Sequence, residues 1–271
     1  MMGRLNLFVG AGLVGAWLLA VAVSSVYTPA DPLSMDFSAR LQAPAEGSLM
    51  GTDQYGRDLY SRVLVASRIS FGVSFATVVF AMTLGAVIGA LAGYVGGLTD
   101  RIVVMCLDAL MAFPPLLLVL MFLSVVGPSV PAVVLALGVG YTPTAARVMR
   151  GTVLSIREVE YVEASRVLGG SDAWTLWRHV LPNAVSPLTV LATSMFATVL
   201  LLESALSFLG LGVPPPAATW GGLLADGRQF LSQAPWLCIF PGLVISLALL
   251  GVNLLGDALR DRLDPHQRDT V

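Results

Sequence analysis

Apolar and polar residues alternate along this chain in long blocks. Six apolar stretches reach or approach the about 20 residues that a helix needs to cross the hydrocarbon core of a bilayer. They are residues 5–27, 71–95, 102–126, 130–146, 184–202 and 235–255. The pattern predicts an all-α membrane protein with six transmembrane helices. An even number of spans places the two termini on the same side.

The first apolar stretch also has features of a secretory signal peptide, since Arg4 precedes it and Ala20 and Ala22 resemble a cleavage site. Its length exceeds the about 7 to 15 residues of a signal-peptide core. We therefore expect a retained membrane span.

The arginines decide the expected orientation, because loops rich in positive charge remain in the cytoplasm. With the N-terminus inside, ten of the fifteen arginines fall in cytoplasmic segments. The longest cytoplasmic segment, residues 147–182, carries five of them: Arg147, Arg150, Arg157, Arg166 and Arg178. We expect both termini to be cytoplasmic.

The segment between the first two apolar stretches, residues 28–69, is expected outside the cytoplasm. Its last part, residues 57–68, has helical amphipathic spacing and is predicted to lie along the membrane surface. Asp53 and Asp58 would suit a calcium loop, but Tyr55 and Arg57 stand where oxygen ligands are needed, so capping and salt bridges are expected. Residues 1–69 are thus expected to form an N-terminal unit, and residues 70–271 a core of five spans.

Composition excludes several kinds of chemistry. The chain has 12% charged residues and no lysine, so it can form neither a P-loop nor a Schiff base. Cys106 and Cys238 lie in or beside apolar stretches, and His179 and His266 are far apart. Neither a disulfide, a metal site nor a bound cofactor is predicted, and nothing points to nucleic acid.

The polar segment at residues 147–182 is expected to contain two short helices. An amphipathic helix over residues 157–168 ends at Gly169 and Gly170, and Ser171 or Asp172 caps a second helix. In that second helix we expect Trp174 and Trp177 to face the membrane and Thr175 and His179 to face water. Pro182 then begins the fifth span, so the unit is predicted to join directly to a transmembrane helix.

This segment resembles the EAA loop of ABC importer permeases, which in that family docks into a groove of a separate ATPase subunit. The resemblance implies coupling roles for six residues: Glu163, Ala164, Ser165, Gly169, Leu181 and Pro182. Ser165 replaces the usual second alanine, a change expected to leave docking intact and to alter local packing. Two alternatives remain open: Glu163 pairs only with Arg166, and Trp174 and Trp177 are interfacial anchors.

Three further segments resemble the C-type permease subunits of dipeptide and oligopeptide importers: residues 51–70, 203–221 and 253–266, with His266 where arginine is common. Five residues of the middle segment are candidates for the translocation pathway: Glu203, Ser207, Phe208, Gly210 and Gly212. Glu203 and Asp108 also have a simpler interpretation, as acids that reach headgroup water, and Gly210 and Gly212 as parts of a tight turn.

The resemblance implies a type I ABC importer transmembrane fold in the cytoplasmic (inner) membrane of a prokaryote. It also implies a non-catalytic subunit that works with a second permease, two ATPases that bind ATP and Mg, and an extracytoplasmic solute-binding protein. Peptides are the first expectation for the solute, with nickel, glutathione or another small solute as alternatives. An ion-coupled secondary transporter would show paired midplane acids or inverted repeats, and an intramembrane hydrolase a nucleophile and base in a span. Neither pattern stands out.

Overall fold

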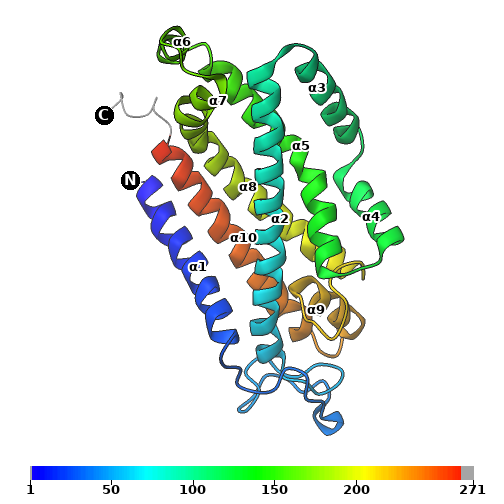
Figure 1. Ribbon diagram of the computed structural model, residues 1–271. Coiled ribbons are helices and arrows are strands. Elements are labelled where there is room, and N and C mark those ends of the chain that lie inside the picture. Colours follow the sequence, from blue (N-terminus) through cyan, green and yellow to red (C-terminus); the bar gives the residue numbers. More distant parts are fainter. Residues whose placement is uncertain (1, 264–271) are drawn as a thin grey trace.

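The structure, a computed structural model, describes residues 2–263 of the 271-residue chain. Long helices form a bundle (Figure 1): α1 (Met2–Ser24), α2 (Leu59–Val95), α5 (Val130–Ile156), α8 (Leu181–Phe208) and α10 (Trp236–Leu263). The shorter helices are α3 (Gly97–Met111), α4 (Pro115–Val126), α6 (Glu160–Val167), α7 (Asp172–Thr175) and α9 (Trp220–Gly227). Three single-turn elements complete the order: Phe37–Ala39, Leu176–Val180 and Arg228–Phe230.

The expected membrane spans are confirmed, with one of them broken. Five helices of the described chain are long and apolar enough to cross a bilayer, and α3 and α4 together make a sixth candidate that is bent by 83°. The bend falls at Pro114 and Pro115, where Pro114 has an extended ψ of 127°. A proline cannot continue the hydrogen-bond pattern of a helix and keeps the residue before it extended, so the double proline divides this span.

Helix α2 begins earlier than the apolar pattern indicates. Asp58 caps it by accepting a hydrogen bond from the backbone N–H of Ser61 at 2.8 Å, and the helix then continues to Val95 without a break. Residues 59–69 are therefore the first turns of a long span instead of a separate helix on the membrane surface. Leu59 and Val63 are buried there, and Trp220 donates a hydrogen bond to the Val63 carbonyl at 3.2 Å. The boundary expected between residues 69 and 70 falls inside α2.

Helices α2 and α5 pack with their backbones in contact. Gly85, Gly89 and Gly93 are spaced four apart and face α5. A Cβ atom added to Gly85 would lie 2.5 Å from the Cβ of Ala145, and one on Gly89 would collide with the Ala146 carbonyl oxygen. Small residues at this spacing allow close helix contact within a membrane.

Two ion pairs join α3 to α5, one near each end of α3. Arg150 donates to both carboxylate oxygens of Asp100, with Nη2 2.6 Å from Oδ2, and Arg147 Nη2 lies 2.6 Å from Asp108 Oδ1. Asp108, one of the two acids considered for the pathway, thus has a partner on the neighbouring helix.

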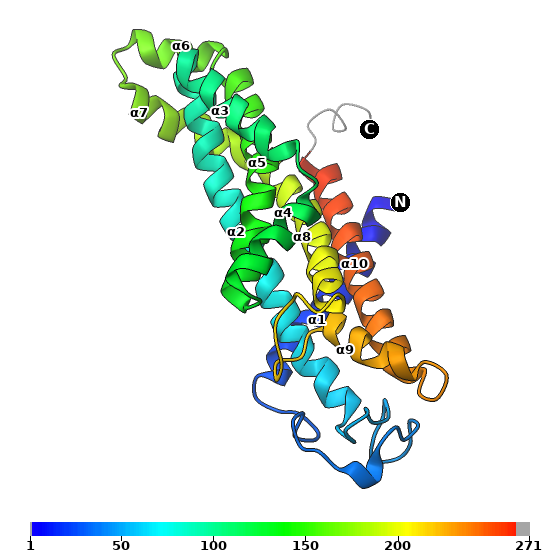
Figure 2. The same ribbon diagram turned by 90° about the vertical axis from the view of Figure 1, so that its right-hand side faces the viewer.

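The two ends of the bundle carry different segments of the chain. Helices α6 and α7 project from one end, and residues 28–58 and α9 lie at the other (Figure 2). Helix α1 begins, and α10 ends, toward the end that carries α6 and α7 (Figure 1). The arginine-rich segment and the described chain ends are therefore on the same side, as the arginine distribution predicts. Asp264, Pro265 and His266 of the third family-like segment lie outside the described residues.

Candidate coupling site

A tight glycine turn connects α6 to α7. Gly169 has φ +87°, a left-handed conformation that strains residues with a Cβ atom. The Gly170 N–H donates to the Ser165 carbonyl at 3.0 Å, and a Cβ atom on Gly170 would lie 2.8 Å from that oxygen. The two glycines therefore end α6 and reverse the chain, as the sequence predicts.

Helix α7 continues directly into the fifth long span. Ser171 caps it by accepting a hydrogen bond from the N–H of Trp174 at 3.3 Å. A π-helical turn, Leu176–Val180, follows, and the helix runs without a break from Asp172 to Phe208. The widened turn ends just before Pro182, which has no N–H to donate. The second short helix and the transmembrane helix thus form one continuous helix.

A pair of buried hydroxyl groups joins α6 to α7. The oxygens of Ser165 and Thr175 lie 3.0 Å apart, and each residue is at most 8% exposed. The expectation that Thr175 faces water is wrong, because its hydroxyl has a partner on the other helix. Ser165, which stands in place of the family's usual alanine, supplies that partner.

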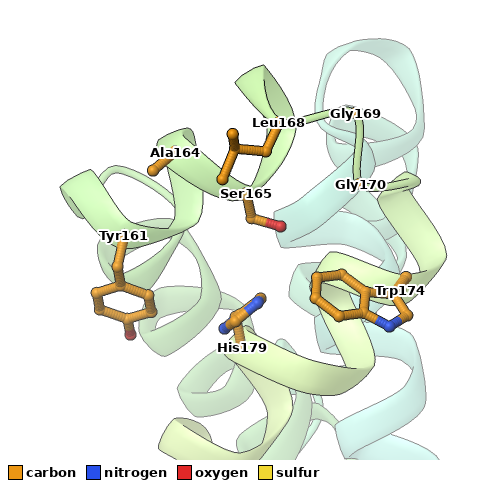
Figure 3. A pocket seen from close by; sticks show the side chains of 8 residues that line it. All are labelled: Tyr161, Ala164, Ser165, Leu168, Gly169, Gly170, Trp174 and His179. Atoms are coloured by element: carbon orange, nitrogen blue, oxygen red, sulfur yellow. The ribbon is translucent and has the colours of Figure 1, made fainter.

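The two short helices and the π-helical turn border an open cavity of about 550 Å³, shown in Figure 3 with Ser165 and His179 turned toward it. Its lining comes from both helices and the turn between them: Tyr161, Ala164, Ser165, Leu168, Gly169, Gly170, Trp174 and His179. Three of the six predicted coupling residues, Ala164, Ser165 and Gly169, thus lie together. Glu163 is exposed on α6, and Leu181 and Pro182 form the start of α8.

Large apolar side chains are exposed around this cavity. Val167 is 80% exposed, Leu168 87%, Trp174 53% and Trp177 74%. The Trp174 ring meets His179 edge-on at 5.1 Å between centroids, which fixes its position on the cavity wall. Several large exposed apolar side chains on neighbouring short helices are typical of a contact surface for another protein or for membrane.

The candidate pathway residues lie at the opposite end of α8. Ser207, Gly210 and Gly212 line a cavity of about 620 Å³, and Phe208 and Gly210 border a second cavity of about 350 Å³. Gly210 has φ +81°, so the tight-turn interpretation holds for it. Glu203 lines neither cavity. It is fully buried and accepts a hydrogen bond from the Ser207 hydroxyl at 2.9 Å, and its place in a pathway stays a prediction.

Sequence reasoning missed the charged part of the larger cavity. Arg57, Arg62 and Asp226 line it together with the pathway candidates. Asp53 forms a salt bridge to Arg57 at 2.7 Å, which confirms the capping and salt-bridge interpretation of the acids in this segment. Arg57 and Arg62 belong to the family-like segment at residues 51–70, whereas Asp226 comes from α9, and only the fold places the three in one cavity.

The bundle of long apolar helices, with one broken span and a short helix pair at one end, has the fold of a type I ABC importer transmembrane subunit. A chain of the MetNI methionine ABC transporter, solved in inward-facing conformations, superposes with a TM-score of 0.61 at 18% identity. The match covers 75% of this chain and 96% of that one.

The protein belongs to the family of binding-protein-dependent transport system inner membrane components, whose characteristic sequence matches residues 85–269. A protein of Brucella suis biovar 1, named provisionally as a peptide transport system permease, is 40% identical over 98% of this chain and 89% of its own length. A glutathione transport system permease protein of Pectobacterium atrosepticum is 38% identical over 97% of this chain and 88% of its own length. Both relatives are transport permeases, which agrees with a subunit that carries no catalytic site.

Proposed function

We propose that this permease carries peptides into the cell across the cytoplasmic (inner) membrane as one half of an ATP-driven importer. The names of the relatives support the solute class, since one refers to peptides and the other to glutathione, itself a small peptide. The chain has no lysine and so no P-loop of its own, and in this proposal separate ATPase subunits that bind ATP and Mg supply the energy. A second permease completes the pathway, and an extracytoplasmic solute-binding protein delivers the solute.

The cavity between α6 and α7 is the proposed docking surface for the ATPase. Exposed Leu168, Trp174 and Trp177 supply apolar contact area around Ala164 and Gly169, and exposed Glu163 supplies a charge. Apolar anchors inside a polar rim are the usual composition of such surfaces.

One observation carries the proposed coupling mechanism: α7 and α8 form a single helix from Asp172 to Phe208. A force applied to α6 passes through the Ser165–Thr175 contact to α7 and then along α8, past Leu181 and Pro182. At its other end α8 carries Glu203, Ser207 and Phe208, the residues proposed for the pathway. Closure of the ATPase subunits thus tilts a helix whose far end borders the cavity of about 620 Å³.

The complete importer reconstituted in proteoliposomes tests this function. We expect a peptide-loaded binding protein to stimulate ATP hydrolysis and uptake of a radiolabelled peptide. Glu163→Arg is expected to abolish the stimulation while the permease remains in the membrane, and Glu46→Arg, on the exposed outer segment, serves as a matched charge reversal. Normal stimulation in the Glu163 variant would contradict the coupling role, and uptake of nickel without peptide uptake would overturn the solute assignment.

A further inference from the structure

The larger cavity, at the end of the bundle that carries α9, contains a buried arginine, Arg62, from the family-like segment at residues 51–70. The cavity lies where the start of α2, α9 and the loop after α8 meet, and its volume of about 620 Å³ is within the range of small-molecule sites. Arg62 belongs to the first turn of α2 and is only 5% exposed. Burial of a charged guanidinium group is unfavourable unless partners compensate its charge.

Some N–H groups of the Arg62 side chain have no hydrogen-bond acceptor among residues 2–263. Its Nη1 atom lies 3.5 Å from Asp53 Oδ2 and its Nη2 atom 3.7 Å from Asp226 Oδ2, both beyond the usual 2.7–3.2 Å of a hydrogen bond. Within the described part of the chain, Nε and Nη1 are buried and have no hydrogen-bond acceptor. Buried donors without an acceptor are unfavourable, so this arrangement favours the arrival of one.

Asp53 is held in place by its own loop, so it stays at an ion-pair distance from Arg62 and does not close to a hydrogen bond. Its Oδ1 atom accepts from the backbone N–H groups of Tyr55 at 2.8 Å and Arg57 at 3.0 Å. Its Oδ2 atom accepts from Arg57 Nε at 2.7 Å. Asp53 is therefore bound mainly by Arg57 and its own loop, and Arg62 has two distant counter-ions, Asp53 and Asp226.

Asp226 is a loose counter-ion. It comes from α9, its side chain is 47% exposed, and its carboxylate approaches Arg62 only to 3.7 Å. Since it can turn into water, a second carboxylate can take its place without leaving a buried negative charge unpaired.

We propose that Arg62 anchors a carboxylate-binding subsite in this cavity and holds the carboxylate of the transported solute as it enters, displacing Asp226. The planar guanidinium fork donates two parallel hydrogen bonds to a carboxylate, which a lysine or an amide cannot reproduce. The inference rests on the proposed function, because peptides and glutathione carry a free carboxylate. A small solute fits the site better than a side chain of the binding protein, since Arg62 is almost completely buried within this chain.

The test uses the permease–ATPase complex in lipid nanodiscs, without binding protein, and measures equilibrium binding of radiolabelled dialanine against dialanine amide. We expect the wild type to bind dialanine about tenfold more tightly than the amide, as charge-assisted hydrogen bonds imply. Arg62→Gln is expected to abolish the difference. Asp226→Asn removes the competing carboxylate and is expected to tighten dialanine binding several-fold. Arg40→Gln, at an exposed arginine of the same outer segment, is expected to change neither value.

Equal binding of the two probes by the wild type, or an unchanged difference in Arg62→Gln, would overturn the inference. Should Arg62→Gln fail to assemble, Asp226→Asn decides: unchanged affinity for dialanine counts against the subsite. A separate measurement of binding-protein docking distinguishes the source of the carboxylate. If Arg62→Gln weakens docking of peptide-free binding protein and leaves probe discrimination intact, the acid belongs to the binding protein and the solute assignment is overturned.

The inference and the proposed function fail separately. Peptide uptake by a wild-type importer that does not distinguish dialanine from its amide would overturn only the subsite. Discrimination by a complex that imports no peptide would support the subsite and overturn peptide import.

Discussion

The hydroxyl oxygens of Ser165 and Thr175 lie 3.0 Å apart and form a buried side-chain hydrogen bond between α6 and α7. Either group can be the donor. Its position beside the Gly169 turn makes it a direct link between the first short helix and the helix that continues into the membrane. The structure therefore identifies a contact through which the proposed coupling is transmitted.

Removal of one of the two hydroxyl groups is expected to destabilise the protein more than removal of both. Ser165→Ala or Thr175→Val leaves a buried hydroxyl group without its hydrogen-bond partner, which destabilises the protein by about 1–3 kcal/mol. The double variant leaves neither of these two buried hydroxyl groups without a partner. We expect each single variant to reduce peptide-stimulated ATP hydrolysis and the double variant to recover part of it. A double-mutant cycle on the stimulated rate measures this coupling, and strictly additive effects would show that the hydroxyls do not interact.

The backbone at Gly169 is expected to require a residue that tolerates positive φ. A Cβ atom there meets nothing within 4 Å, so the cost of a substitution comes from the φ of +87° alone. Gly169→Val is expected to cost about 1–2 kcal/mol and to lower stimulated ATP hydrolysis strongly, and Gly169→Asn to be tolerated. Equal loss in the two variants would exclude the backbone explanation.

The contact between α2 and α5 is expected to tolerate no side chain at Gly89. Gly89→Leu places a side chain against the Ala146 backbone and is expected to destabilise the protein by about 1–3 kcal/mol. Gly72→Leu is the matched control on the same helix, because a Cβ atom at Gly72 meets nothing within 4 Å. Thermal unfolding of the purified protein in detergent compares them, and similar melting temperatures would contradict the close packing.

The orientation can be measured by cysteine labelling in a background that lacks Cys106 and Cys238. Ser171 and Glu46 are both exposed. Ser171 caps α7, and Glu46 belongs to residues 28–58, which lie at the opposite end of the bundle from α7 (Figure 2). A membrane-impermeant maleimide is expected to label Glu46→Cys in intact cells and Ser171→Cys only in inverted vesicles. Labelling of Ser171→Cys from outside would reverse the topology.

Much of the fold follows from the sequence because spans depend on a local property, the length of apolar segments. The glycine turn at Gly169 was also predictable, since glycine is favoured where φ is positive. The start of α2 was not, because residues 59–69 mix charges with apolar residues and their burial depends on Trp220 from a distant segment. The repeat of Gly85, Gly89 and Gly93 was a visible small-residue pattern that indicates close helix packing.

The candidate sites were predicted less completely, for a physical reason. Ala164, Ser165 and Gly169 are close in sequence, so their clustering around one cavity follows from local helix geometry. Thr175 was misplaced because helical periodicity does not show that its hydroxyl meets Ser165 across a turn. Arg62 and Asp226 belong to α2 and α9, and only tertiary packing places them in one cavity.

The 37 residues of α2 have one further consequence. At 1.5 Å per residue the helix is about 55 Å long, nearly twice the about 30 Å thickness of the hydrocarbon core. Its first turn carries Arg62 at the end of the bundle that holds α9, and its last turns pack against α5 near the end that holds α6 and α7. In a helix of this length, a change of tilt of a few degrees moves the end by several ångströms. Solute binding near Arg62 and the state of the ATPase subunits can therefore influence each other through α2 without unfolding of the helix.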